Sequence, residues 1–252
     1  MNKSRLLIKI ITLMFAVFMF VNTANSSEIR VAVASNFSET IKALSKRFEE
    51  KTGHRVVVIV GSTGKHYAQI KHGAPYDIFF AADKARPKLL DDEGVSIPSS
   101  RFTYAIGQLV LWSPTKGFIE DGLNVLHQDK FRYLALANPR LAPYGAAAQE
   151  ILQADGLWSE LQDKIVKGEN IGQTFQFVQS GNAELGFVAY SQVKTRIELM
   201  EGSVWVVPQS RYTPIEQQAV LLKDNAVARD FITFIRDGES KKLIESFGYR
   251  SL

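Results

Sequence analysis

Short apolar runs alternate with segments of helical periodicity along the chain from Ile29 onward. The run 29–34 is typical of a buried strand, and the apolar residues after it recur every three or four positions, as on one face of a helix. The alternation repeats before residue 94, which predicts parallel strands covered by helices. The predicted strands are 29–34, 55–60 and 77–81. The predicted helices are a segment from Phe37 that ends at Thr52-Gly53, a segment through Tyr67 and Ile70 that stops at Gly73, and 84–93.

A long apolar strand over 108–112 interrupts this rhythm, and the cycle then starts again. Strands are predicted at 133–137, 185–189 and 217–222, and helices at 145–154, at 173–179 and at a closing segment through Val227, Phe231 and Ile235. Two α/β lobes are therefore expected, with crossings near 103–108 and 208–214. The first lobe would comprise 27–106 and 209–252, and the second lobe 107–208.

The first 26 residues differ from the rest of the chain. A basic start without acidic residues precedes the apolar stretch 10–21, and small residues follow at Ala24 and Ser26. This order is typical of a cleaved secretory signal peptide. The apolar stretch is shorter than the roughly 20 residues that span a bilayer, and no Cys follows it as a lipid anchor. We predict a signal peptide over 1–26 and a mature chain that starts near Ser27.

The mature chain is almost neutral. The whole sequence has 30 Lys and Arg against 26 Asp and Glu, and three of the basic residues, Lys3, Arg5 and Lys9, lie in the predicted signal peptide. The remaining 27 basic and 26 acidic residues give no electrostatic footprint for nucleic acid, so no nucleic-acid partner is expected. The absence of Cys excludes a disulfide framework.

Three turns that lead into predicted helices carry small or hydroxyl residues. In α/β sheets, ligands bind at the carboxyl ends of strands, and the free N–H groups of a helix start attract anions. The turns also have a plainer interpretation: Asn36 with Glu39 resembles a capping box, Ser35 or Ser62 would cap a helix, and Gly61 and Gly64 would relieve backbone strain. The turns are Ala34-Ser35-Asn36-Phe37, Gly61-Ser62-Thr63-Gly64-Lys65 and Ala142-Pro143-Tyr144-Gly145.

The central positions of these turns contain no Asp or Glu. A site for a protonated anion needs an acceptor for the anion's O–H group, because an unpaired O–H in a dry pocket is penalised. The composition therefore favours a fully deprotonated dianion. The positions are Ser35, Asn36, Ser62, Thr63, Gly64, Tyr144 and Gly145.

Competing motifs fail on spacing. A phosphate-binding loop needs a Gly where Ile59 stands and a Ser or Thr where His66 stands, and no Ser lies in a G-x-S-x-G elbow. The pair Asp77 and Asp83 flanks a strand and is interpreted as structural. The histidines His54, His66, His72 and His127 have no metal-ligand spacing and are interpreted as surface residues. We expect no enzyme activity, no cofactor and no direct metal coordination.

Taken together, the motifs resemble those of the periplasmic molybdate-binding proteins of ABC transporters. The resemblance runs from Glu28 to the ending Phe247-Gly248-Tyr249. It implies a periplasmic-binding-protein type II fold, in which two α/β lobes joined by a two-segment hinge enclose the ligand. The motifs are Ser35-Asn36, Gly61-Ser62-Thr63-Gly64-Lys65, Ala68-Gln69-Ile70, Gly73-Ala74-Pro75, Asp77-Ile78-Phe79, Ala81-Ala82-Asp83, Ala137-Asn138-Pro139, Pro143-Tyr144-Gly145 and Leu185-Gly186-Phe187-Val188.

The resemblance also implies the ligand contacts. Ser35 and Ser62 would each donate a hydroxyl and a backbone N–H, and Tyr144 and Ile171 would donate backbone N–H groups. Asn36 is a further contact in the branch of the family that carries Ser-Asn. Other members have a serine cluster at the second turn, so that Thr63 would replace or join Ser62 here.

One position departs from the family pattern. The Tyr that some members place directly after Gly-x-Val corresponds to Ala189 here, and Tyr190 is one residue late. Tyr190 is therefore interpreted as a packing aromatic and not as a ligand.

The resemblance implies a monomer in the periplasm that delivers molybdate or tungstate to a membrane permease. Two alternatives stay open. The same fold would also serve sulfate, phosphate or another small oxyanion, and an exported hydrolase would use Ser35 or Ser62 as its nucleophile.

Overall fold

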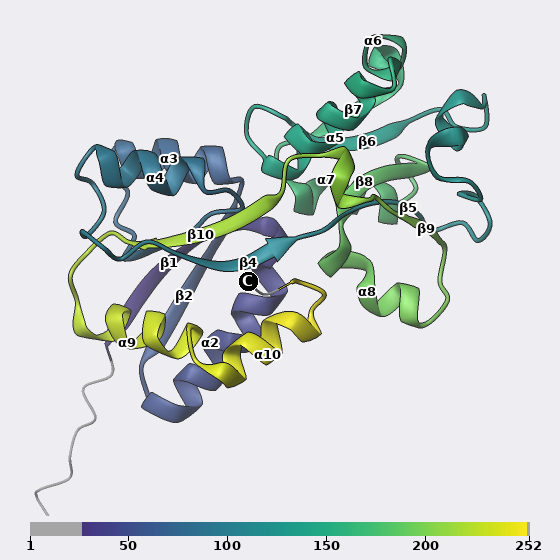
Figure 1. Cartoon of the computed structure of the whole chain (residues 1–252). Coiled ribbons are helices and arrows are strands. Elements are labelled where there is room, and N and C mark those ends of the chain that lie inside the picture. The colour runs from purple at the N-terminus through teal and green to yellow at the C-terminus, as the bar shows by residue number, and fades with distance from the viewer. Residues whose placement is uncertain (1–26, 251–252) are drawn as a thin grey trace, which may run out of the picture.

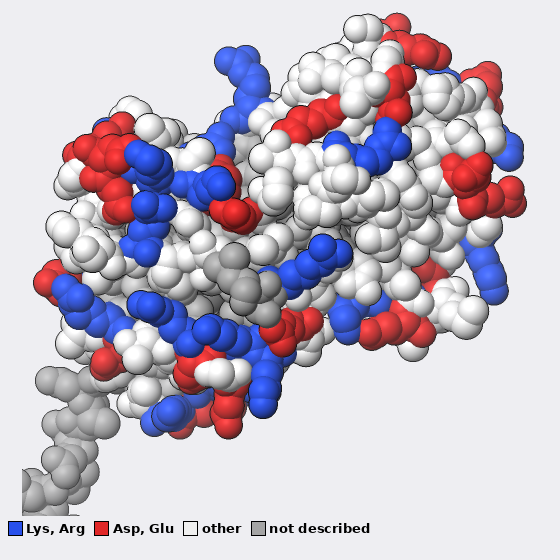
Figure 2. Space-filling view, viewed as in Figure 1, with Lys and Arg blue, Asp and Glu red and all other residues white. Residues whose placement is uncertain are grey.

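Two five-stranded sheets organise the chain in the computed structural model, which describes residues 27–250 (Figure 1). The predicted signal peptide over 1–26 lies outside the described residues. None of the helices within 27–250 is long and apolar enough to cross a membrane. Acidic and basic side chains are interspersed over the face of the molecule in Figure 2, in keeping with the nearly equal numbers of basic and acidic residues after position 26.

The first lobe is built on a mixed sheet with the strand order β2-β1-β3-β10-β4. Strand β1 (Glu28–Ala34) pairs in parallel with β2 (Arg55–Gly61) and β3 (Ile78–Phe80), whereas β10 (Ile215–Leu221) runs antiparallel to β3 and β4 (Phe102–Gly107). Helices cover both faces (Figure 1). They are α3 (Thr63–Lys71) and α4 (Ala85–Asp92) on one face, and α2 (Ser38–Thr52), α9 (Ala226–Ile235) and α10 (Gly238–Ser246) on the other.

The second lobe is built on a sheet with the strand order β7-β6-β8-β5-β9. Three of its strands are parallel, and β5 runs antiparallel to both of its neighbours. The strands are β5 (Leu109–Ser113), β6 (Leu134–Ala137), β7 (Ile165–Gly168), β8 (Leu185–Ala189) and β9 (Ser203–Val206). The helices are α5 (Pro143–Ala154), α6 (Leu157–Glu160), α7 (Ile171–Gln179) and α8 (Tyr190–Glu198).

Two connections join the sheets. The chain leaves the first sheet after β4, enters the second at β5, and returns between β9 and β10. The prediction of two α/β lobes is confirmed, and β10 shows that the C-terminal part of the chain completes the first sheet. The exact boundaries of the lobes, 27–106 with 209–252 for the first and 107–208 for the second, stay a prediction.

Several elements differ from the sequence prediction. The segment predicted as a crossing, 103–108, is mostly strand β4, whose hydrogen-bonding partner β10 lies more than a hundred residues later in the chain. Neither sheet is purely parallel. The helix predicted to close the chain, α9, is followed by α10, which Asp237 caps by accepting a hydrogen bond from the Ser240 N–H at 2.7 Å. The sequence prediction also omitted β7, α6, α8 and β9.

An aromatic cluster stabilises the first lobe and anchors the turn that follows β1. Phe37, the last residue of this turn, is fully buried, and its ring centroid lies 4.6 Å from that of Tyr104. Phe231 of α9 packs edge-on against Phe48 of α2 at 5.0 Å and against Phe80 of β3 at 6.4 Å. Because Phe37 is packed into this core, the two residues before it are held at the end of β1.

We predict that Phe231→Ala lowers the free energy of unfolding by about 3 to 5 kcal/mol, because it leaves a cavity among buried rings. Chemical denaturation followed by tryptophan fluorescence measures this change. Leu89→Ala is the matched control: its side chain is 44% exposed, so its effect should stay near 0.5 kcal/mol. Equal effects of the two substitutions would contradict this account of the core.

Candidate anion-binding site

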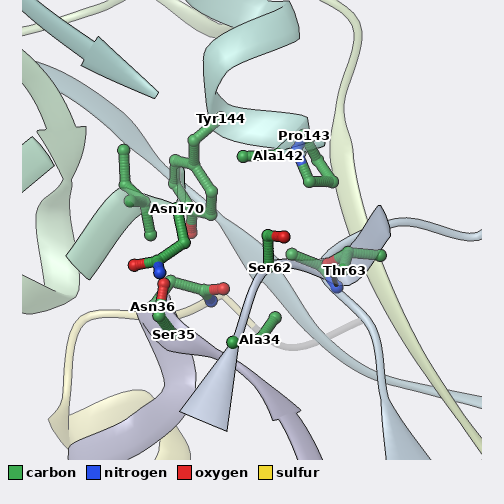
Figure 3. Close-up of a pocket in the computed structure, with 12 residues that line it drawn as sticks. Ala34, Ser35, Asn36, Ser62, Thr63, Ala142, Pro143, Tyr144 and Asn170 are labelled. Atoms are coloured by element: carbon green, nitrogen blue, oxygen red, sulfur yellow. Dashed lines mark hydrogen bonds between the residues drawn. The ribbon is translucent and has the colours of Figure 1, made fainter. Parts of the chain in front are cut away.

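A small cavity lies between the lobes, where strands end and helices begin (Figure 3). None of its lining residues is charged. The structure brings together all six predicted ligand residues, Ser35, Asn36, Ser62, Thr63, Tyr144 and Ile171. The remaining lining residues are Ala34, Gly61, Ala82, Ala142, Pro143 and Asn170.

Ser35 begins the loop after β1 and reaches across the cleft. Its Oγ accepts a hydrogen bond from the backbone N–H of Gly172, in the second lobe, at 3.0 Å. A hydroxyl has one hydrogen to donate and two lone pairs. Ser35 therefore links the lobes as an acceptor and keeps its hydrogen for a ligand.

Asn36 does not cap a helix. The N-cap of α2 is Phe37, without a side-chain hydrogen bond, so the capping-box interpretation of Asn36 and Glu39 is wrong. The Asn36 Nδ2 group instead donates to Gln217 Oε1 at 2.8 Å and to the Tyr249 hydroxyl at 3.1 Å. Burial beside these two long-range partners draws the side chain away from the helix start.

In the turn after β2, the hydroxyl oxygens of Ser62 and Thr63 accept hydrogen bonds from backbone N–H groups of the same lobe. Ser62 caps α3, because its Oγ accepts from the Lys65 N–H at 3.3 Å. Thr63 Oγ1 accepts from the Ala82 N–H at 3.0 Å and thereby ties the loop to the end of β3. Both residues are at least 98% buried, and both retain a hydroxyl hydrogen.

The second lobe presents two helix starts to the cavity. Tyr144 lies in the first turn of α5 and Ile171 in the first turn of α7, where backbone N–H groups have no acceptor within the helix. Asn170 caps α7 by accepting from the Gln173 N–H at 3.0 Å. Sequence reasoning missed Asn170 because it started this helix at Gln173, and the cap residue was the signal that would have found it.

Gly61 and Gly64 permit close approach and do not relieve strain, since neither has a positive φ. The Gly64 N–H donates to the carbonyl oxygen of Leu141, in the other lobe, at 2.9 Å. A Cβ at Gly64 would lie 3.1 Å from both the Cα and the oxygen of Leu141. A Cβ at Gly61 would lie 2.7 Å from the Nε2 atom of His66.

Two residues near the site do not line it. Lys65 pairs with Glu169 of the second lobe at 3.3 Å, and both side chains are more than half exposed, so the pair contributes little. Tyr190 is partly buried against the hydrophobic core of the second lobe and lies close to Gly248. Neither residue borders the cavity.

The histidine prediction is wrong for His66. Its side chain is 2% exposed and packs edge-on against Tyr76 and Phe79, with ring centroids 5.7 and 6.2 Å away. The overlooked signal is its position four residues before Ile70, which places both on the helix face that packs on the sheet. Burial lowers the pKa of His66 below 6.5, so the ring is neutral near pH 7.

Buried phenols beside the cavity also stay neutral. Burial raises the pKa of Tyr144 well above its ordinary value, and the nearby phenol of Tyr249 raises it further. The pKa of Tyr104 is raised for the same two reasons. No group of His, Asp or Glu in the described chain is arranged to hold a metal ion. The site can therefore offer an anion only uncharged donors.

We predict that His66 makes the folded chain sensitive to mild acid. The unfolded chain binds a proton below about pH 6.5, whereas the folded chain resists it, so the free energy of unfolding falls as the pH drops below that value. Denaturation between pH 7.5 and 5 should show a steeper fall for the wild type than for His66→Gln. His127→Gln removes an exposed histidine and should retain the wild-type slope. Parallel slopes for the wild type and His66→Gln would contradict the prediction.

Comparisons with known proteins agree with this geometry. Residues 29–250 match the family model of the bacterial extracellular solute-binding proteins. The molybdate-binding protein ModA of Azotobacter vinelandii is 45% identical over 90% of this chain and 91% of its own length. The solved structure of an A. vinelandii periplasmic molybdate-binding protein superposes with a TM-score of 0.85 at 41% identity, covering 89% of this chain and 99% of that chain.

A more distant structure has the same architecture. The substrate-binding domain of a molybdenum ABC transporter, described as putative, from Clostridium difficile gives a TM-score of 0.66 at 26% identity, over 90% of this chain and 100% of its own. These neighbours confirm the type II fold of periplasmic binding proteins. The chain belongs to the bacterial extracellular solute-binding proteins and, among them, to the ModA family of molybdate-binding proteins.

Proposed function

We propose that this protein captures molybdate as a dianion and holds it by neutral hydrogen bonds between its lobes. One observation carries the proposal: uncharged donors from both lobes line a single cavity that has no charged residue. Ser35 and Ser62 supply hydroxyls and backbone N–H groups from the first lobe. Tyr144 and Ile171 supply backbone N–H groups from the second, and Asn36 and Thr63 supplement them.

The anion provides the charge that such a site lacks. Hydrogen bonds to an ionised partner are roughly twice as strong as neutral ones. The helix starts at Tyr144 and Ile171 add the positive ends of two helix dipoles. Half a dozen such bonds in a site closed to water suffice for tight binding without a countercharge.

Size separates molybdate from smaller anions in this proposal. The donors lie on two lobes whose approach is limited by the Gly64 and Leu141 backbones. A large tetrahedral anion reaches donors on both lobes, whereas sulfate leaves some of them unpaired, and each unpaired buried donor costs about 1 to 3 kcal/mol. Tungstate, which has the same shape and charge, is expected to bind as molybdate does.

The contacts of the two serines support a binding role over hydrolysis. Ser35 Oγ is paired with the Gly172 N–H and Ser62 Oγ with the Lys65 N–H, not with a histidine or a carboxylate that would take a proton. We propose that the protein has no enzyme activity or resident cofactor and acts as a monomer in the periplasm. It would deliver its anion to the permease of an ABC transporter.

We predict that molybdate and tungstate raise the melting temperature strongly and that sulfate does not. A ligand at 100 times its dissociation constant stabilises the folded chain by about 2.7 kcal/mol. Calorimetric titration of the mature chain measures the three affinities, and size-exclusion chromatography checks for a monomer. Stabilisation by sulfate without stabilisation by molybdate would overturn the choice of ligand.

We predict that Gly64→Ala weakens molybdate binding about tenfold without lowering stability. The new Cβ keeps the Leu141 backbone from its closed position, while Ala can adopt the backbone conformation of Gly64, whose φ is not positive, and loses less conformational entropy on folding than Gly. Titration and thermal unfolding give the two quantities.

Gly238→Ala is the matched control for this substitution. It also changes a helical glycine, but a Cβ there has nothing within 4 Å. It should leave the affinity unchanged. Unaltered affinity in Gly64→Ala would show that closure does not depend on this approach.

A further inference from the structure

Gln217 of β10 is fully buried behind the cavity and does not line it. Its Oε1 atom accepts from Asn36 Nδ2 at 2.8 Å and from the Tyr104 hydroxyl at 2.9 Å. Its Nε2 group donates to the Tyr144 hydroxyl of the second lobe at 3.2 Å. Gln217 therefore joins a cavity residue of the first lobe to one of the second.

Two features of this network are unsatisfied. The Oδ1 atom of Asn36 is buried without a hydrogen-bond partner, and the end of this side chain points toward the space between the Ser35 and Ser62 loops (Figure 3). Tyr104 has one hydroxyl hydrogen but faces two acceptors, Gln217 Oε1 at 2.9 Å and the Ala81 carbonyl at 3.0 Å. A buried acceptor without a donor costs about 1 to 3 kcal/mol.

A coupled half-turn of the two amides removes the conflict at Tyr104 and gives Asn36 Oδ1 a donor, and it leaves Asn36 Nδ2 with a hydrogen that only an anion in the cavity would accept. Turning an amide exchanges its acceptor oxygen and its donor nitrogen. Gln217 Nε2 would then donate to Asn36 Oδ1 and to the Tyr104 hydroxyl, whose own hydrogen is left for Ala81. Gln217 Oε1 would accept from the Tyr144 hydroxyl, and Asn36 Nδ2 would take the place of the unpaired oxygen.

The remaining contacts of Asn36 tolerate this turn. The Tyr249 hydroxyl lies 3.1 Å from Asn36 Nδ2 and 2.7 Å from the Asn36 carbonyl oxygen, so its hydrogen can serve either the side chain or the backbone. The Asn36 carbonyl also accepts from Ser191 Oγ at 3.3 Å. Neither amide can turn alone, because Asn36 and Gln217 would then face each other with two oxygens or two nitrogens.

We propose that Gln217 is a positioning residue for the bound anion: its amide turns together with that of Asn36, so that Asn36 Nδ2 donates to the anion. This inference rests on the proposed function. Gln217 contacts Tyr144 of the second lobe in either orientation, because the phenol can accept from Nε2 or donate to Oε1. Gly107 leaves room for this contact, because a Cβ there would overlap the Tyr144 hydroxyl and the Gln217 amide.

The test is a double-mutant cycle on molybdate affinity, measured by calorimetry. Gln217→Met keeps the volume but neither donates to Asn36 nor orients it, and it should weaken binding about tenfold or more. In an Asn36→Ala background the same change should weaken binding less than about twofold, because it acts through Asn36. Gln218→Met is the matched control: Gln218 is also buried, but it contacts Arg101 and Thr103, and its loss should leave the affinity unchanged.

A spectroscopic measurement on the wild type needs no folded Gln217 variant. The side-chain NH₂ resonances of Asn36, identified by their loss in Asn36→Ala, should shift strongly when molybdate saturates the ¹⁵N-labelled protein. Failure of the wild type to bind molybdate would refute the proposed function itself. Binding with unshifted Asn36 resonances, or an equal Gln217→Met effect in both backgrounds, would overturn the role of Gln217 alone.

Discussion

Each hydroxyl at the ends of the first-lobe strands that line the cavity is held in place by a hydrogen bond that it accepts within the protein. Ser62 accepts from its own helix, Thr63 from the end of β3, and Ser35 from the opposite lobe. The backbone donors of Tyr144 and Ile171 are fixed by the helices to which they belong. In the binding role proposed above, these hydroxyl and backbone donors would not need to be ordered by the anion, and they would replace its water shell without a countercharge.

The two lobes meet through backbone and small side chains at the rim of this cavity. Gly64 and Leu141 approach at the level of their main chains, and Ser35 receives the Gly172 N–H. Such contacts tolerate little displacement, whereas the exposed Lys65 and Glu169 pair can vary in geometry at little cost. The distance between the lobes is thus set by short-range packing, and in the binding role proposed above it would fix the size of the anion that both lobes can contact.

Local sequence signals predicted the parts of the site that depend on local structure. The loops at Ser35, Ser62 and Tyr144 follow from strand ends and helix starts, which neighbouring residues determine. Long-range pairing determines the rest. Strand β4 forms because β10 pairs with it. The Asn36 side chain does not cap a helix because it donates hydrogen bonds to Gln217 and Tyr249. His66 shows a middle case, since it was interpreted as a surface residue from its polarity, whereas its helical spacing from Ile70 is the signal that indicates burial.

The polar side chains buried behind the cavity are hydrogen-bonded to one another, and these bonds compensate for their removal from water. Burial raises the pKa of Tyr104, Tyr144 and Tyr249, so the network carries no charge of its own near neutral pH. A fixed charge there would bind any anion of opposite sign, or repel all of them. In the role that we propose, neutral groups whose amides and hydroxyls can reverse their hydrogen bonds would instead respond to the one partner that satisfies every donor, so that selectivity would depend on geometry.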